Sequence, residues 1–178
     1  MALTATVGSA SADSYADEDY ARAYFVKTPF NATWQALGSD LQEYWLRSAM
    51  LPIEEQDYMG RRTNNSDVLQ ALQFPRIASY NRAGLSNAAD TWEDKQGRVW
   101  ATDAIPTPVK DAQCEQALAM SQNGEYLSDR YKSKEISDGE TTLTLNTGRD
   151  LGALCPKAKL LLRPFLAIES GNGRVERN

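Results

Sequence analysis

The sequence predicts a mainly α-helical fold: a small helical bundle with long loops, one β-hairpin and an extended C-terminal tail. Apolar residues recur at helical spacing in several separate stretches, Asp138-Gly139 separates two alternating stretches, and residues 60–108 show no regular period. A chain of 178 residues with 42% hydrophobic content is long enough to build its own core. We therefore expect one domain over residues 1–178.

Small residues and helix caps define the N-terminal part. Residues 1–13, which include Gly-Ser-Ala-Ser-Ala-Asp at positions 8–13, are expected to form a flexible lead-in. Ser14 or Asp17 can cap a short first helix, because a side-chain oxygen there accepts from the open N–H groups of the first turn. The chain then turns around Pro29. The core face of this helix is expected to hold Tyr20, Ala21, Tyr24 and Phe25.

A second helix is predicted to begin near Asp40 and to kink or restart at Pro52, which lacks the N–H that a helix interior uses. After Gly60 the pattern is irregular. The loop region at residues 60–108 is longer than ordinary connections, and long loops are usually functional or interfacial. The buried stripe of the second helix is expected to be Leu37, Leu41, Tyr44, Trp45 and Ala49.

A third helix is predicted to start after Pro108, since proline suits the first helical turn, and to stop near Asn123. It completes the helical core, which we place at residues 14–130. The side facing the core is expected to hold Val109, Ala112, Cys114, Ala117 and Leu118.

The C-terminal part is predicted to contain a β-hairpin over residues 131–146, a helix over 153–168 and a mobile tail over 169–178. The helix opens at Pro156, and Pro164 bends or ends it. Its apolar face is expected to be Ala158, Leu161, Leu162, Phe165 and Leu166.

The composition argues against most enzyme classes. Histidine is absent, and with it the commonest general base and metal ligand. No phosphate-binding loop or dinucleotide glycine motif is present, and Cys114 and Cys155 alone cannot form a zinc site. We expect no enzyme activity, no cofactor and no metal, and two buried thiols. An enzyme that uses carboxylates alone stays open as an alternative, and a metal-dependent activity would reveal it. The acidic runs at 17–19 and 54–57 are interpreted as helix-start charges or solvated faces.

The sequence has no apolar run of membrane-spanning length and no basic start followed by an apolar stretch. We therefore expect neither a membrane segment nor a secretion signal, and assembly in the cytoplasm. The net charge of −5 is uneven. Residues 1–60 carry nine acids and three bases, whereas 156–178 carry two acids and five bases. The two ends either attract each other within one molecule or steer a subunit onto a partner.

The loop region combines arginines with aromatic rings, a mixture that single-strand binders use. The candidates are Arg61, Arg62 and Arg76. Residues 61–100 carry only four acids against six bases, which releases few counterions, so tight non-specific binding to DNA is not expected. We favour the alternative interpretation, in which these arginines anchor the loop region and Phe74, Trp92 and Trp100 fill the core.

An ordered series of short motifs carries a family resemblance. It begins with Met-Ala-Leu-Thr at 1–4 and continues with Ala-Tyr-Phe at 23–25, Gly-Arg-Arg-Thr at 60–63, Leu-Gln-Phe-Pro-Arg at 72–76 and Val-Lys-Asp-Ala-Gln-Cys-Glu at 109–115. In this order they resemble the head-to-tail adaptor (connector or neck) proteins of tailed phages. That group is often labelled DnaT-like single-stranded-DNA-binding protein. The resemblance covers nearly the whole chain but not residues 78–104.

The resemblance implies a structural virion protein in the neck between capsid and tail. Its subunits would form a ring, generally of twelve, that binds the portal protein above and a neck or tail protein below. Genomic DNA would pass without specific binding, and a net acidic chain suits such a conduit. The alternative function is a single-stranded-DNA-binding replication accessory protein. Candidate portal-docking residues are Arg163, Arg174, Val175, Arg177 and Asn178; candidate inter-subunit residues are Ile136, Asp138, Gly139, Leu143 and Leu145.

Overall fold

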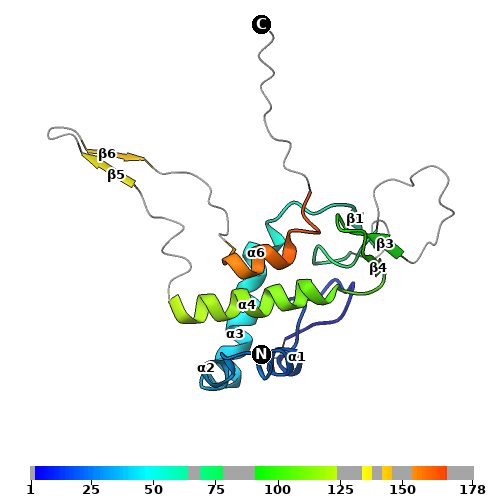
Figure 1. Ribbon diagram of the computed structural model, residues 1–178, viewed down its shortest axis with the longest axis horizontal. Helices are drawn as coiled ribbons and strands as arrows, with labels where there is room; N and C mark the ends of the chain where they lie inside the picture. Colours follow the sequence, from blue (N-terminus) through cyan, green and yellow to red (C-terminus); the bar gives the residue numbers. More distant parts are fainter. Residues whose placement is uncertain are drawn as a thin grey trace, which may run out of the picture.

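The structure is a computed structural model that describes residues 3–63, 69–77, 91–123, 134–137, 142–145 and 154–167. The mainly α fold is confirmed, with short antiparallel strand pairs added to the helices (Figure 1). The helices are α1 (Glu18–Phe25), α2 (Asn31–Gln35), α3 (Ser39–Glu54), α4 (Thr107–Asn123) and α6 (Pro156–Leu162). The strands are β1 (Arg61–Arg62), β2 (Arg76–Ile77), β3 (Thr91–Glu93), β4 (Val99–Ala101), β5 (Lys134–Ser137) and β6 (Thr142–Leu145).

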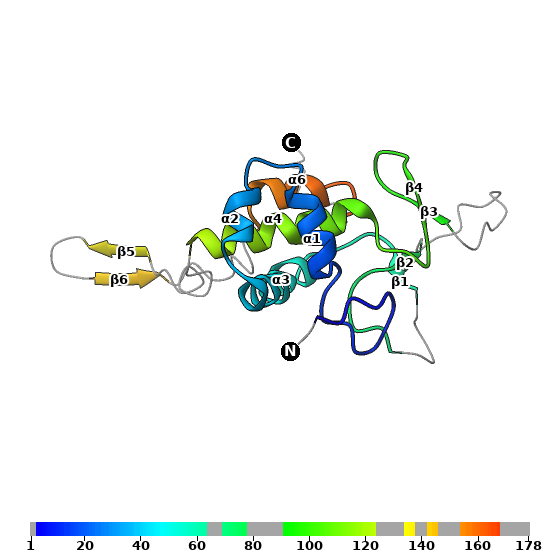
Figure 2. The ribbon, with the colours of Figure 1, turned by 90° about the horizontal axis from the view of Figure 1, so that it is seen from below.

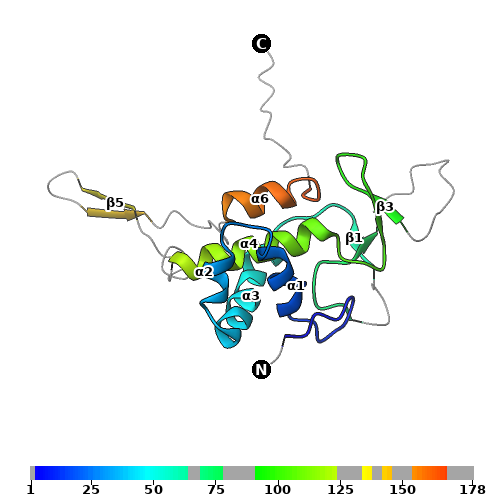
Figure 3. The same cartoon turned by 60° about the horizontal axis from the view of Figure 1, so that its bottom comes forward.

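Helix α4 is the centre of the fold, with α3 packed on one side and α6 on the other (Figures 2 and 3). Nearly every position from Val109 to Met120 is buried or half-buried, including polar ones. One hydrophobic cluster joins α4 to α6 and the β3–β4 side, and a second joins α4 to α1, α2 and α3. The predicted core positions of this helix are all buried.

The first helix agrees with its prediction. Asp17 caps α1, and its Oδ1 accepts from the Tyr20 N–H at 2.8 Å. Glu18 and Asp19 pair with Arg22 across one turn, so this acidic run consists of a cap and solvated charges. Ala21 and Phe25 are fully buried, and both tyrosines pack against the second cluster.

The predicted turn around Pro29 is present, and a helix that was not predicted follows it. Residues 31–35 form helix α2, because burying Trp34 against Phe25, with ring centroids 4.6 Å apart, outweighs weak local propensity. Helix α3 runs through Pro52 to Glu54, so the helix does not restart at Pro52.

The predicted buried stripe of the second helix is wrong at Leu41 and Tyr44 but right at Ala49, and Leu37 and Trp45 are partly buried against the second cluster. Leu41 is 50% exposed and Tyr44 is 53% exposed. The side that faces α4 instead holds Gln42, Leu46, Ala49, Met50 and Ile53. Small or hydrogen-bonded side chains on the buried side allow α3 and α4 to approach closely. A prediction based on large apolar side chains therefore selects the exposed face of α3.

The N-terminal segment differs from the expected flexible lead-in over its described part, residues 3–13. The Thr4 N–H donates to Asp13 Oδ1 at 2.7 Å, and Asp13 also pairs with Arg47 at 2.9 Å. The Ala71 N–H donates to the Ser9 carbonyl oxygen at 3.1 Å. Small residues therefore permit close packing here, where composition alone suggested freedom.

The loop region contains two strand pairs that the sequence pattern did not predict: β1 with β2, and β3 with β4. The predicted hairpin is present, since β5 pairs with β6 and Ile136 lies opposite Leu143. Helix α6 is shorter than the predicted 153–168 and ends at Leu162, two residues before Pro164. The tail at 169–178 lies outside the described residues.

Candidate nucleic-acid interface

Arg76 is buried, with 5% of its surface exposed. Its guanidinium donates to the carbonyl oxygens of Met59 (2.6 Å), Tyr58 (3.1 Å) and Gly60 (2.6 Å). Its Nη1 also donates to the backbone and side-chain oxygens of Gln73. A planar fork of donors that is satisfied by fixed carbonyl groups holds a chain turn in place. Arg76 therefore anchors the loop region and has no donor left to offer a ligand.

Arg61 and Arg62 together form β1, and Arg62 lies opposite Arg76 in the pairing with β2. Arg62 is half-buried, and its Nη1 donates to the Gln70 carbonyl oxygen at 3.2 Å. Arg61 is exposed. Of the three predicted arginines, Arg61 is the one whose side chain a ligand can reach directly.

The aromatic rings of the loop region lie in the core. Phe74 is 1% exposed and Trp92 is 4% exposed, and both stack within the first cluster around Phe165. They cannot stack on bases, which require an exposed ring face. Trp100 is half-buried, and its ring centroid lies 5.6 Å from that of Phe165.

Glu54 fastens the Gln73–Phe74 segment onto the end of α3. Its Oε1 accepts from the Tyr15 hydroxyl, and its Oε2 accepts from the Gln73 N–H at 2.8 Å. Burial raises the pKa of Glu54, although these hydrogen bonds and nearby arginines oppose the shift. The carboxylate is thus occupied by structural contacts.

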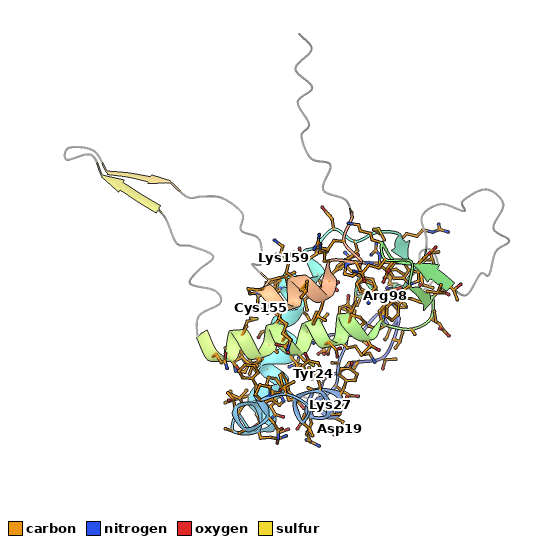
Figure 4. The ribbon with its side chains drawn as sticks, viewed as in Figure 1. Asp19, Tyr24, Lys27, Arg98, Cys155 and Lys159 are labelled. Atoms are coloured by element: carbon orange, nitrogen blue, oxygen red, sulfur yellow. The ribbon has the colours of Figure 1, made fainter. Side chains whose placement is uncertain are left out.

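A different group of basic residues is exposed. Helix α6 and the residue after it carry Lys159 and Arg163, and residues 154–167 contain no acid. The β3–β4 turn carries Lys95 and Arg98, and it is joined to the end of α6 by the hydrogen bond from the Lys95 N–H to the Pro164 carbonyl oxygen (3.1 Å). We call Lys95, Arg98, Lys159 and Arg163 the basic surface. Figure 4 shows Lys159 and Arg98 on the upper part of the molecule, away from Lys27.

Three acids limit the charge of this region: Glu93, Glu115 and Asp94, which forms an ion pair with Arg98 at 2.8 Å. Glu93 is exposed at the end of β3, beside the basic surface. Glu115 is nearly buried and pairs with Lys157, which also lies 5.8 Å from the Tyr24 ring centroid. Lys157 is left out of the basic surface because Glu115 and the Tyr24 ring hold its ammonium group. Arg98 is kept because its pairing with Asp94 engages only Nε within the described residues.

The β3–β4 turn is built around Asp94, whose side chain has no exposed area. Its Oδ1 accepts from the N–H groups of Gln96 (2.8 Å) and Arg98 (3.1 Å). Its Oδ2 accepts from Arg98 Nε (2.8 Å) and Trp100 Nε1 (3.0 Å). Burial alone would raise the pKa of Asp94, but these hydrogen bonds outweigh it and lower the pKa.

The sequence contains a local signal for this turn, which hydrophobic periodicity does not reveal. Asp94 and Gly97 occupy the first and fourth positions of a turn, the pattern that a type I turn favours. Gly97 has φ +77°, which favours glycine and closes the short hairpin. The run Asp-Lys-Gln-Gly at 94–97 therefore indicates a tight turn at this position.

Helix α3 presents an exposed apolar stripe on the side opposite α4. Leu41, Tyr44 and Leu51 are 50%, 53% and 43% exposed, and they lie on one side of the helix. Exposed apolar side chains that gather on one face usually mark a surface that another molecule covers.

Comparison with known protein families matches the whole chain, residues 1–178, to the family described as "Putative DnaT-like ssDNA binding protein". The chain belongs to this DnaT-like family. A search of curated proteins and a search of solved structures each gave no match.

The other predicted site residues of this DnaT-like protein are only partly described. Arg163 is exposed at the C-cap of α6. Ile136 and Leu143 pair across the β5–β6 hairpin, and Leu145 pairs with Lys134. Outside the described residues lie Asp138, Gly139, Arg174, Val175, Arg177 and Asn178.

Cys114 is buried and Cys155 is half-buried, and neither forms a disulfide. Within the described ranges, no three carboxylate, thiol or imidazole groups gather in a way that could hold a metal ion. None of the described helices is long and apolar enough to cross a membrane.

Proposed function

We propose that this DnaT-like protein binds single-stranded DNA through the basic surface. The observation that supports it is the exposed set of Lys95, Arg98, Lys159 and Arg163 on two joined elements, in a chain whose family is described by that activity. Phosphate groups supply most of the affinity in non-specific binding, and cations on one face can follow a flexible backbone.

The binding is expected to be weak and salt-sensitive. Arg98 is already paired with Asp94, so Lys95, Lys159 and Arg163 are the cations counted here. If each neutralises one phosphate, the slope of log K against log salt is roughly −2 for a single strand. The net charge of −5 opposes approach to DNA at low salt. Measurable binding is therefore expected near 50 mM salt and little of it at physiological ionic strength.

The test is fluorescence anisotropy with a labelled oligo-dT at several salt concentrations. Lys159→Glu removes a cation from the basic surface, while Lys27→Glu makes the same change at an exposed position on the other part of the molecule. We expect Lys159→Glu to weaken binding at least several-fold and to reduce the slope, and Lys27→Glu to do much less. Equal effects of both variants, or no binding by the wild type at low salt, would refute the proposal.

A second candidate function is the phage head-to-tail adaptor that the sequence resembles. The apolar stripe of α3 favours it, because a ring subunit buries such a face against a neighbour. In this role the partners would be the portal, further copies of the chain and a neck or tail protein, with genomic DNA passing through the ring.

Quantitative mass spectrometry of purified virions separates the two candidates. A copy number equal to that of the portal protein would support the adaptor, and absence from virions would exclude it. Two further variants refine the adaptor reading: removal of residues 171–178 should weaken portal binding, and Leu143→Glu should leave the subunit folded but abolish the ring. Unchanged portal binding by the truncated chain would contradict a docking role for the tail.

A further inference from the structure

The four residues of the basic surface are not equivalent, because only Arg98 has its guanidinium fixed in place by buried structure. Arg98 donates its Nε to Asp94 Oδ2 at 2.8 Å, and the Asp94 side chain is fully buried. The Arg98 guanidinium carbon also lies 5.4 Å from the Trp100 ring centroid and 6.0 Å from that of Phe165. A carboxylate on one edge and rings beneath hold the guanidinium plane in one orientation.

The remaining donors of Arg98 are its two Nη groups. The contacts in the described part of the chain engage only Nε, and 42% of the side chain is exposed. A guanidinium with one edge fixed and two parallel N–H donors available matches two oxygens of a tetrahedral anion. Little side-chain entropy is lost on binding, because the orientation is already set.

We propose that Arg98 is the phosphate-contacting residue of the basic surface, binding two oxygens of one backbone phosphate through its Nη groups, with Asp94 as its positioning residue. This rests on the proposed binding of single-stranded DNA. Lys95, on the same turn, and Arg163, next to Pro164, supply the diffuse positive charge that favours a polyanion over an isolated carboxylate. Glu93 opposes the approach of the anion and sets a limit on affinity.

The test compares Arg98→Lys with Arg163→Lys in the full chain, using labelled oligo-dT. Both variants keep the charge, but only the first loses a preoriented fork. We expect Arg98→Lys to weaken binding by about tenfold, the size of one lost charge-assisted hydrogen bond, with an unchanged salt slope. Arg163→Lys is expected to stay within about twofold, because a flexible exposed arginine and a lysine neutralise a phosphate about equally. Equal affinities of the two variants would overturn the proposal.

A second measurement separates this inference from the function on which it rests. Pyrophosphate offers the same oxygens without bases or a long backbone, and its binding is followed by calorimetry and by competition with oligo-dT. Binding of pyrophosphate that is lost in Arg98→Lys, without binding of oligo-dT, would retain the phosphate site and reject single-stranded DNA as its ligand. If oligo-dT bound equally well to the wild type and to Arg98→Lys, the proposed binding of single-stranded DNA would stand and Arg98 would be rejected as its phosphate contact. Near-ultraviolet circular dichroism, to which Trp92 and Trp100 contribute with the other aromatic side chains, checks that each variant keeps its tertiary structure.

Discussion

Gln113→Leu removes a buried polar side chain that makes four hydrogen bonds in the core. Gln113 is fully buried in α4, and its Oε1 accepts from the N–H groups of Tyr15 (3.0 Å) and Ala16 (2.9 Å). Its Nε2 donates to Ser14 Oγ (2.7 Å) and to the Leu46 carbonyl oxygen (2.8 Å). One amide thus joins the N-terminal segment, α3 and α4, and all four of its hydrogen-bonding positions are used.

The loss of stability in Gln113→Leu comes mainly from two buried N–H groups that are left without an acceptor. Ser14 Oγ keeps its bond to the Ala16 carbonyl oxygen at 2.6 Å, and the Leu46 carbonyl lies inside α3, where the helix satisfies it. The N–H groups of Tyr15 and Ala16 lose their acceptor. Each buried unsatisfied donor costs about 1 to 3 kcal/mol, and the gain from burying leucine offsets part of it. We expect a loss of about 3 kcal/mol in the free energy of unfolding.

Urea unfolding followed by circular dichroism measures this loss. With a slope near 2 kcal/mol per M, the midpoint should fall by roughly 1.5 M. Gln122→Leu, at an exposed position of the same helix, is the matched control and should change stability by less than about 0.5 kcal/mol. A midpoint for Gln113→Leu that equals that of the control would refute the reasoning.

Three further changes test other contacts. Arg76→Lys should cost about 2 to 4 kcal/mol in urea unfolding, because an ammonium cannot reach the carbonyl groups that the fork binds, whereas Arg61→Ala should be nearly neutral; the reverse order would contradict the anchoring role. Asp94→Asn should cost about 2 to 4 kcal/mol at neutral pH, since an amide N–H₂ would face the donors of Arg98 and Trp100. Folding lowers the pKa of Asp94, so the stability advantage of aspartate over asparagine should be complete above the ordinary carboxyl range and should shrink as the pH falls through the lowered pKa. Unfolding curves of the wild type and Asp94→Asn from pH 7 to pH 2.5 measure this difference. A stability difference that does not change with pH would contradict the prediction.

Local sequence signals predicted the elements that depend on neighbouring residues. Asp17 caps α1, and Pro108 lies in the first turn of α4. Both signals could be predicted from the sequence because caps and prolines act on residues within a few positions. The face of α3 could not be predicted this way. Gln42 is buried because its Nε2 reaches the Trp34 carbonyl oxygen at 2.8 Å, a contact between two helices that no period reveals.

The candidate site was harder to predict than the fold. Arg61, Arg62 and Arg76 were predicted as a site because they lie near one another in the sequence. The donors of Arg76 are instead occupied by carbonyl groups that the chain turn places around its guanidinium. The basic surface unites residues near position 96 with residues near 161, and a backbone hydrogen bond between Lys95 and Pro164 joins them. Spacing along the chain contains no information about such a meeting.

The hydrogen bonds between Gln113 and the N-terminal segment also imply an order of events during synthesis on the ribosome. Its partners Ser14, Tyr15 and Ala16 lie 97 to 99 residues earlier in the chain. At translation rates of about 5 to 20 residues per second, these partners leave the ribosome roughly 5 to 20 seconds before the amide that receives them. During that interval the N-terminal segment and α3 expose the apolar surfaces that α4 later covers. Chaperones that bind nascent chains therefore have a defined window in which to act on this protein, and it closes when α4 emerges.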